Sequence, residues 1–403
     1  MCLLYCTRYL IAYNQHPPVL NMSKNVVIIS PAHPYRGGQA LVEAHIHRTL
    51  TDNGYDCNTV SFKLLYPKIF FPGRTQYDIS NHSFLKHRQH IKRIINSIDP
   101  LSWNKSVRHI SKLKPDVVLF VWWTPFLGPA YSWIINGLRK HCDAKIGFVV
   151  ENYISHEKRW FDHYWSKKTL DKADFFISHS KYIGKCIKEN HEAKLYTTTL
   201  PVYHLFDLDQ WDSLSAKKQL GLQSGKVILY FGLIRHYKGL DRLLHSFETI
   251  MKDHPETWLL IAGEFYDDPA KYDEIIVSHP YADRIKLVAD FIPNEEVEMY
   301  FKACDVVCLP YRNASQSGIQ MIAYGFGKPV VITNVGGLSE TVIDGVTGAI
   351  APENSIAGIT DALTRTLSDL DKVDFAKNIQ DYIDGIGYQH LPGIMEKIMM
   401  DET

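Results

Sequence analysis

The chain has 403 residues, of which 45% are hydrophobic and 22% are charged, and its 44 basic side chains balance 44 acidic ones. This composition excludes a disordered chain, a collagen-like repeat and a small disulfide-stabilised scaffold. The length predicts two or three domains, each large enough to bury its own core, and two is the simpler fit. The zero net charge argues against a dedicated nucleic-acid-binding protein.

Residues 1–21 contain a mildly apolar stretch but neither a basic start nor a small-residue cleavage site, so they do not resemble a signal peptide. Met22 follows directly and precedes the apolar run NVVIIS. We therefore interpret residues 1–21 as a tail or a start-site artefact and expect the folded protein to begin at Met22.

Two segments repeat the order strand, glycine loop, helix, strand. The first runs from NVVIIS through PAHPYRGG into a helix and then a strand over 56–62; the second runs from KVILYFG through LIRHYKG into a helix and then WLLIAGE. Strands that are apolar without alternation predict parallel sheets covered on both faces. Right-handed crossovers then make each segment half of a Rossmann-like domain.

Further apolar strands are expected in both halves, at 116–123, 145–152, 174–180, 283–291, 305–311 and 328–334. The sequence thus predicts an α/β protein of two facing Rossmann-like domains with a cleft at the carboxyl ends of their strands. The expected parts are an N-terminal domain over 22–205, a linker over 206–225, a C-terminal domain over 226–375, and a C-terminal helix within 376–403 that packs back on the first domain.

The span from Lys63 to Lys114 carries eleven Lys or Arg residues against Asp78 and Asp99, a net charge of +9, with aromatic residues between them. One interpretation is a face for an anionic membrane or a lipid-diphosphate acceptor. The other is a dispersed basic surface that is balanced elsewhere in the fold. No nucleic-acid-binding motif accompanies the charge, so we expect no nucleic-acid partner.

Seven cysteines occur without a C-x-x-C pair, which indicates neither a disulfide framework nor a zinc site. Cys304 and Cys308 lie in the run ACDVVCLP, where the alternation of a strand predicts two buried thiols on one face. We expect no metal and a reducing compartment.

The second glycine loop places Arg235 and Lys238 directly before a predicted helix. Cations oppose the dipole at a helix N-terminus, so an anion such as a pyrophosphate would compensate them. A solvated turn with two surface cations is the alternative.

A second possible anion site is the segment 313–318, where Ser317 can cap the next helix and Gly318 lets a ligand approach the first-turn N–H groups. An ordinary capped helix explains that segment equally well.

The run LPYRNASQSGIQMIAYGFGKPVVITNVGGLSETVIDGVTGAIAP, with FGLIRHYKGLDRLL and PAHPYRGGQALVEAHIHRTL, resembles the family 4 retaining glycosyltransferases, which are group 1 glycosyltransferases of GT-B fold. The resemblance covers about residues 24–395. It implies a nucleotide-sugar donor, UDP- or GDP-linked, held mainly by the second domain, and a glycan or lipid-linked acceptor held by the first. It also implies no cofactor and a cytoplasmic enzyme that can be peripheral at the inner face of the membrane.

By this resemblance, the candidate site residues fall into three groups. Catalysis would use Glu151, His156, Arg235 and Lys238. Donor binding would use Gly37, Gly38, Arg235, Lys238, Phe291, Gln316, Ser317, Gly318, Ile319 and Gln320. The acceptor side would include Phe70, Phe71 and Arg74.

The chain departs from the family pattern in three places. Leu233 replaces the arginine that usually follows the glycine of the second-domain loop, so Arg235 would substitute for it. The paired glutamates of the family align with Ala314 and Ile322, which leaves Gln316, Ser317 and Gln320 as the nearest polar replacements. Glu151 aligns with a histidine of the family, and His156 is either its replacement or an ordinary loop histidine.

The sequence therefore favours a retaining hexosyltransferase in polysaccharide or glycoconjugate biosynthesis. A nucleotide-sugar epimerase or phosphorylase of the same fold would use the same phosphate site. The loss of the paired glutamates leaves a non-catalytic nucleotide-sugar-binding homologue as a further alternative.

Overall fold

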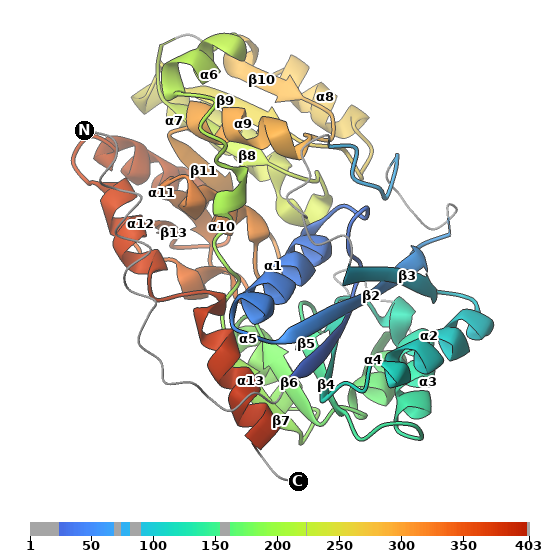
Figure 1. Ribbon diagram of the computed structural model, residues 1–403. Helices are drawn as coiled ribbons and strands as arrows, with labels where there is room; N and C mark the ends of the chain where they lie inside the picture. Colours follow the sequence, from blue (N-terminus) through green and yellow to red (C-terminus); the bar gives the residue numbers. More distant parts are fainter. Residues whose placement is uncertain (1–23, 68–73, 81–89, 154–161, 223, 401–403) are drawn as a thin grey trace.

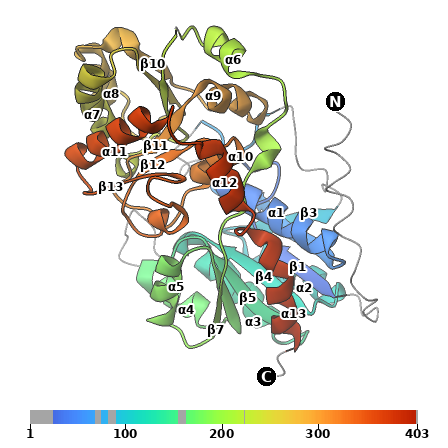
Figure 2. The same cartoon turned by 90° about the vertical axis from the view of Figure 1, so that its left-hand side faces the viewer.

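A computed structural model describes residues 24–67, 74–80, 90–153, 162–222 and 224–400 of the chain. Within these ranges it contains two parallel β-sheets, one of seven strands and one of six, each flanked by helices. Figures 1 and 2 show the two sheets in separate domains that face each other.

The first sheet has the strand order β3-β2-β1-β4-β5-β6-β7, which is the order expected for a doubly wound Rossmann-like domain. Buried aliphatic runs such as VVLFVW form its central strands. Its elements, in which η marks a short 3₁₀ helix, are β1 (Asn25–Ile29), α1 (Gly38–Asp52), β2 (Asp56–Leu64), β3 (Ile91–Asn96), α2 (Pro100–Lys112), β4 (Val117–Trp122), η3 (Pro125–Leu127), α3 (Gly128–Leu138), β5 (Lys145–Val150), α4 (Asp162–Leu170), β6 (Phe175–Ser178), α5 (Lys181–Lys188) and β7 (Lys194–Thr197).

The second sheet has the order β10-β9-β8-β11-β12-β13 and repeats the same winding. Its strands and helices are β8 (Val227–Phe231), η5 (His236–Lys238), α7 (Leu240–Asp253), β9 (Trp258–Ala262), α8 (Ala270–Val277), η6 (Ala282–Arg284), β10 (Ile285–Val288), η7 (Asn294–Glu296), α9 (Val297–Ala303), β11 (Val306–Leu309), α10 (Gly318–Gly325), β12 (Val330–Thr333), η8 (Leu338–Thr341), β13 (Gly348–Ala351) and α11 (Ile356–Asp369).

In the part of the chain that the structure describes, two segments connect the domains. The first passage holds η4 (His204–Phe206) and α6 (Ser213–Gln219), and α6 packs against α9, so part of the segment expected to be a linker belongs to the second domain. After α12 (Phe375–Ile383) and η9 (Tyr388–His390), α13 (Leu391–Met400) returns to the first domain and lies along α1, as Figures 1 and 2 show. Lys145 Nζ donates to the Ile398 carbonyl at 2.7 Å and anchors the end of α13.

Apolar side chains link the two domains. The cluster that covers one face of the first sheet, with Val42 and Ile46 of α1, is continuous with Tyr203 and Phe206 in the passage and with Ile322 of α10. The opposite outer faces of the two sheets have separate clusters. The interdomain cluster therefore holds both domains around one cleft.

The structure corrects some expected elements. The strands β3, β7 and β13 were not expected, and β10 is shorter than the predicted 283–291. Both predicted thiols are buried, but Cys304 ends α9 and packs in the interdomain cluster, whereas Cys308 lies in β11 and faces the outer cluster. The two cysteines do not share a strand face, because α9 ends before β11 begins.

Candidate functional site: a cleft between the two domains

A cavity of about 590 Å³ lies between the domains, where loops from the carboxyl ends of both sheets converge. The first domain contributes the loop between β1 and α1 and the residues that follow β4 and β5, including Trp123 and Asn152. The second domain contributes the loops that follow β8, β9, β10 and β11.

Lys238 is a half-buried cation that lines this cavity. Its Nζ lies 5.4 Å from the centroid of the Tyr311 ring, and within the described part of the chain it makes no hydrogen bond or ion pair. Burial, and to a lesser degree the charge of Arg235, lowers the pKa of Lys238 to about 8. Arg235 also lines the cavity and places its guanidinium 4.8 Å from the centroid of the Tyr266 ring.

Gly239 determines the turn that presents these two cations. Its φ of 71° ends η5 and begins α7, and a Cβ atom there would lie 2.0 Å from the Pro310 carbonyl oxygen. The sequence placed Arg235 and Lys238 directly at a helix N-terminus. The structure instead inserts η5 before α7, and Lys238 turns back toward Gly232.

The loop between β11 and α10 and the first turn of α10 form the adjoining wall, with Gln316, Ser317, Gly318 and Ile319. Ser317 occupies the N-cap position of α10, but its side chain makes no capping hydrogen bond, contrary to the sequence prediction. Its hydroxyl lies 3.5 Å from the Tyr311 hydroxyl instead.

The positions aligned with the paired glutamates, Ala314 and Ile322, both line the cavity. Leu233 and Ile319 lie in the same lining. Ile322 belongs to the interdomain apolar cluster, and Ile319 packs against it. This part of the cavity is therefore apolar.

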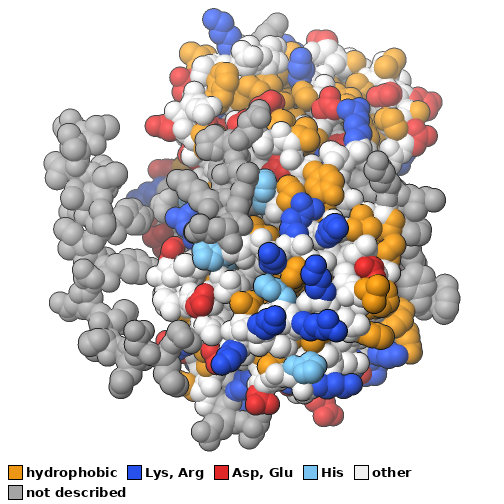
Figure 3. Space-filling model, turned by 45° about the vertical axis from the view of Figure 1, so that its right-hand side comes forward, with side chains coloured by type: hydrophobic (Ala, Val, Ile, Leu, Met, Phe, Trp, Pro, Cys, Tyr) orange, Lys and Arg blue, Asp and Glu red, His pale blue; other side chains and the backbone are white. Residues whose placement is uncertain are grey.

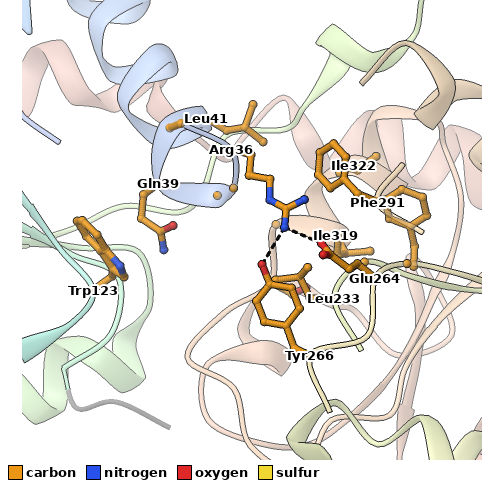
Figure 4. A pocket seen from close by; sticks show the side chains of 18 of the residues that line it. Arg36, Gln39, Leu41, Trp123, Leu233, Glu264, Tyr266, Phe291, Ile319 and Ile322 are labelled. Atoms are coloured by element: carbon orange, nitrogen blue, oxygen red, sulfur yellow. Dashed lines mark hydrogen bonds and ion pairs between the residues drawn. The ribbon is translucent and has the colours of Figure 1, made fainter. Parts of the chain in front are cut away.

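An ion pair crosses the cavity from one domain to the other. Arg36 Nη2 donates to Glu264 Oε2 at 2.6 Å and to the Tyr266 hydroxyl at 3.0 Å. Figure 4 shows the Arg36 side chain projecting toward the second domain between Tyr266 and Phe291. Arg36 stands directly before Gly37, and Glu264 follows β9.

A second interdomain cluster lies beside the cavity. Gln316 Nε2 donates to Glu151 Oε2 at 2.8 Å, and His179 Nδ1 lies 2.7 Å from Glu151 Oε1. The Tyr388 hydroxyl lies 2.8 Å from His179 Nε2. Glu151 is buried and is not among the lining residues, so the structure places it behind Gln316 rather than facing the cavity.

The remaining predicted site residues are placed as follows. Gly37, Gly38 and Phe291 line the cavity. Gln320 does not line it, because its amide donates to the carbonyl and hydroxyl oxygens of Thr341. The side chain of Arg74 lies at the exposed rim, paired with Asp290 at 2.7 Å. Phe70, Phe71 and His156 lie outside the described residues.

Sequence reasoning missed Arg36, Glu264, Tyr266 and His179. Arg36 and Glu264 had a usable signal: Arg36 adjoins the first glycine loop, and Glu264 ends the strand motif WLLIAGE. Residues that follow parallel strands line the cleft of such folds, so both positions could have been selected. His179 follows β6 directly and carried the same signal, but the sequence could not show its partners, which come from three distant parts of the chain.

Among the described residues, no group of three or more His, Cys, Asp or Glu side chains is arranged to hold a metal ion. None of the helices described is long and apolar enough to cross a membrane.

The two facing domains define the GT-B fold, and solved structures support this assignment. Sucrose-phosphate synthase of Thermosynechococcus elongatus superimposes with a TM-score of 0.71 at 18% identity, over 93% of this chain and 98% of that one. HepE of Anabaena, solved in complex with UDP-glucose, gives a TM-score of 0.72 at 16% identity, over 93% of this chain and 99% of that one.

Residues 212–382, which form most of the second domain, match the family model "Glycosyl transferases group 1". A D-inositol 3-phosphate glycosyltransferase of Corynebacterium urealyticum is 24% identical over 270 residues, 61% of this chain and 62% of that protein. The match covers less than two thirds of the length of such curated relatives. The predicted GT-B fold is thus confirmed, and the family match over 212–382 agrees with the predicted resemblance to group 1 glycosyltransferases.

Proposed function

We propose that this chain is a glycosyltransferase that moves a hexosyl group from a nucleoside-diphosphate donor to a glycan or lipid-linked acceptor, with retention of configuration. The observation that carries this proposal is Lys238, a half-buried residue whose desolvated ammonium lies in the cleft and has no carboxylate partner among the described residues. A buried charge is costly unless an opposite charge accompanies it, and a donor diphosphate would supply one. Arg235 would provide the second cation.

The chemistry follows from the charge that develops. When the anomeric bond breaks, positive charge builds on the sugar ring and negative charge on the departing diphosphate. Fixed cations at the diphosphate lower that barrier. In the same-face route that we propose for retention, the leaving phosphate oxygen accepts the acceptor proton, so the protein need not supply a nucleophile. Arg235 and Lys238 would thus be the catalytic cations, and Glu151 would position Gln316.

UDP is our first candidate for the nucleotide, since HepE has been solved with UDP and with UDP-glucose; GDP is the second. The donor would lie mainly on the second domain, against the loop before Gly318, where α10 begins without a side-chain cap and can accept an anion. We propose that the enzyme serves polysaccharide or glycoconjugate biosynthesis in the cytoplasm.

A basic groove on the first domain is our candidate for contact with an anionic membrane surface or acceptor. It is lined by Lys63, Lys92, Arg93, Ile94, Lys105 and His109. Figure 3 shows Lys, Arg and His side chains gathered on one face of the molecule. Burial, together with the charges of Lys92 and Lys112, lowers the pKa of His109, as expected in a field of positive charge.

The proposal is tested by a thermal-shift screen with UDP, GDP and ADP, followed by calorimetric titration of the Arg235→Ala and Lys238→Ala variants. A ligand at 100 times its Kd stabilises the protein by about 2.7 kcal/mol. Each variant is expected to weaken nucleotide binding by about 1.5 to 3 kcal/mol, the strength of a charge-assisted hydrogen bond. Binding equal to the parent in both variants would show that the cations do not hold the phosphates.

A non-catalytic nucleotide-sugar-binding protein is the second candidate, because the cleft is apolar at Ala314 and Ile322. Sugar transfer to an added acceptor distinguishes the enzyme from this alternative. Donor consumption without any acceptor would instead indicate an epimerase or phosphorylase.

A further inference from the structure

The ion pair between Arg36 and Glu264 is buried inside the interdomain cavity. Their side chains are only 7% and 6% exposed, although they belong to different domains and lie inside the cavity. Figure 4 shows the two side chains meeting in the space between the domains. Water is thus largely excluded from a contact that any ligand filling the cavity would meet.

Both oxygens of the Glu264 carboxylate are satisfied by donors of the first domain. Oε2 accepts from Arg36 Nη2 at 2.6 Å, and Oε1 accepts from the backbone N–H of Arg74 at 3.0 Å. A buried carboxylate requires such donors, since its charge is otherwise uncompensated. If Arg36 moves away, Oε2 needs a new donor that the ligand must bring.

The Arg36 guanidinium lies close to the cations proposed to bind phosphate. It contacts the Tyr266 hydroxyl at 3.0 Å, and the ring of Tyr266 is covered by the Arg235 guanidinium at 4.8 Å. The Phe291 ring is a further neighbour, with its centroid 4.5 Å from the Arg36 Cζ atom. One tyrosine ring therefore separates Arg36 from Arg235.

We propose that the Arg36–Glu264 pair is replaced when the donor binds: Arg36 turns to the diphosphate, and Glu264 accepts hydrogen bonds from hydroxyl groups of the transferred sugar. This inference rests on the proposed function. It assigns a sugar-hydroxyl site to Glu264, in a cleft whose wall at Ala314 and Ile322 offers no side-chain hydrogen-bond acceptor.

The physical reason is that neither partner can be released alone. Removing Arg36 leaves the buried Glu264 carboxylate without its guanidinium, and removing Glu264 takes a carboxylate away from Arg36. A ligand that carries only an anion or only hydroxyl groups would therefore replace one partner of the pair and not the other. A sugar joined to a diphosphate carries both kinds of group. The pair should therefore favour the intact donor over the nucleoside diphosphate.

The test compares calorimetric Kd values of UDP with UDP-glucose and of GDP with GDP-mannose, using whichever nucleotide binds. Three variants are titrated: Glu264→Gln, Arg36→Gln and Asp290→Asn. Asp290→Asn is the matched control, because it breaks another interdomain ion pair, to Arg74 at 2.7 Å, which lies at the exposed rim. Melting curves confirm folding. If Glu264→Gln does not fold, the double variant Arg36→Gln/Glu264→Gln removes both charges together and is titrated instead.

We expect Glu264→Gln to reduce the preference for the nucleotide sugar over the nucleoside diphosphate at least tenfold, and to bind the nucleoside diphosphate as tightly as the parent or more tightly. Arg36→Gln should weaken binding of the nucleotide sugar at least tenfold, and the double variant should lose the preference. Asp290→Asn should leave both the preference for the nucleotide sugar and the Kd of each ligand unchanged. An unchanged preference in Glu264→Gln or in the double variant would overturn this inference and leave the proposed function standing. Absence of nucleotide binding to the parent would overturn both.

Discussion

Glu340 of the second domain caps a helix of the first. Its Oε1 accepts the backbone N–H of Tyr182 at 2.7 Å, and its Oε2 accepts that of Lys181 at 2.6 Å. Ser180 completes the first turn of α5, since its hydroxyl accepts the Ile183 N–H at 3.2 Å. A carboxylate at a helix N-terminus satisfies unpaired donors and complements the helix dipole. Here the cap also joins the two domains.

Glu340→Ala should lower the free energy of unfolding by about 1 kcal/mol, the usual effect of losing a cap, and should loosen the contact between the domains. Urea denaturation gives the stability, and separated transitions for the two domains would reveal the loosened contact. Ser355→Ala is the control, because Ser355 caps α11 within the second domain, accepting the Gly358 N–H at 3.0 Å. If both variants lose the same stability and neither shows separated transitions for the two domains, Glu340 is only a helix cap.

Nucleotide affinity should depend on pH through Lys238, whose pKa burial lowers to about 8. The diphosphate binds the protonated ammonium, so affinity should be constant below pH 8 and should fall above it, by up to about tenfold per pH unit. Calorimetry at pH 7 and pH 9 measures this fall. In Lys238→Arg the charge persists throughout this range, and the fall between pH 7 and pH 9 should vanish. A fall that persists in that variant would assign it to another group.

The unliganded protein should gain stability when the Lys238 charge is removed. The folded-state pKa of about 8 lies below the ordinary value of 10.5, so the folded protein binds fewer protons than the unfolded chain between these pH values. Its stability therefore rises as pH increases through that range, and at pH 7 the charge costs on the order of 1 to 3 kcal/mol. Lys238→Met should raise the free energy of unfolding by part of this cost at pH 7 and by less at pH 10, as measured by urea denaturation. Equal effects at both pH values would contradict the prediction.

Glu43 is a buried carboxyl in α1, outside the cavity, that hydrogen-bonds the Thr59 hydroxyl. Burial raises the pKa of Glu43 to about 7 from an ordinary value of 4.5. The folded protein then binds more protons than the unfolded chain between pH 4.5 and pH 7, so stability falls as pH rises through this range. Glu43→Gln should be more stable than the parent at pH 8, by up to about 3 kcal/mol, and equally stable near pH 4.5. Chemical denaturation at both pH values decides this.

The basic groove predicts salt-sensitive binding to anionic vesicles. Lys92→Glu/Lys105→Glu should reduce that binding at least about tenfold at low salt, since each cation near an anionic bilayer contributes about 1 kcal/mol. Lys185→Glu/Lys188→Glu on α5 changes the net charge equally outside the groove and should retain most of the binding. Co-sedimentation with anionic and neutral vesicles measures both. Equal losses in the two variants would attribute binding to net charge alone.

The sequence by itself determined the class of fold. Apolar strands such as NVVIIS and KVILYFG can be buried on both faces only in parallel sheets, and the loops that follow them lie at the cleft for the same reason. Arg235 and Gly318 were therefore identified from their loops without the structure, and Gly37 through the family resemblance; all three line the cavity. The short edge strands β3 and β7 escaped prediction because they carry exposed Lys and Arg residues in place of a continuous apolar run.

Only the tertiary structure decided which side chains meet across the cleft. Arg36 and Glu264 are separated by 228 positions, and their ion pair depends on how two independently wound domains face each other. Local periodicity fixes which face of a strand or helix is buried but carries no information on the angle or distance between domains. The same limit explains Glu151, which sequence alignment placed in the site and which the interdomain contacts with His179 and Gln316 place behind the cavity wall.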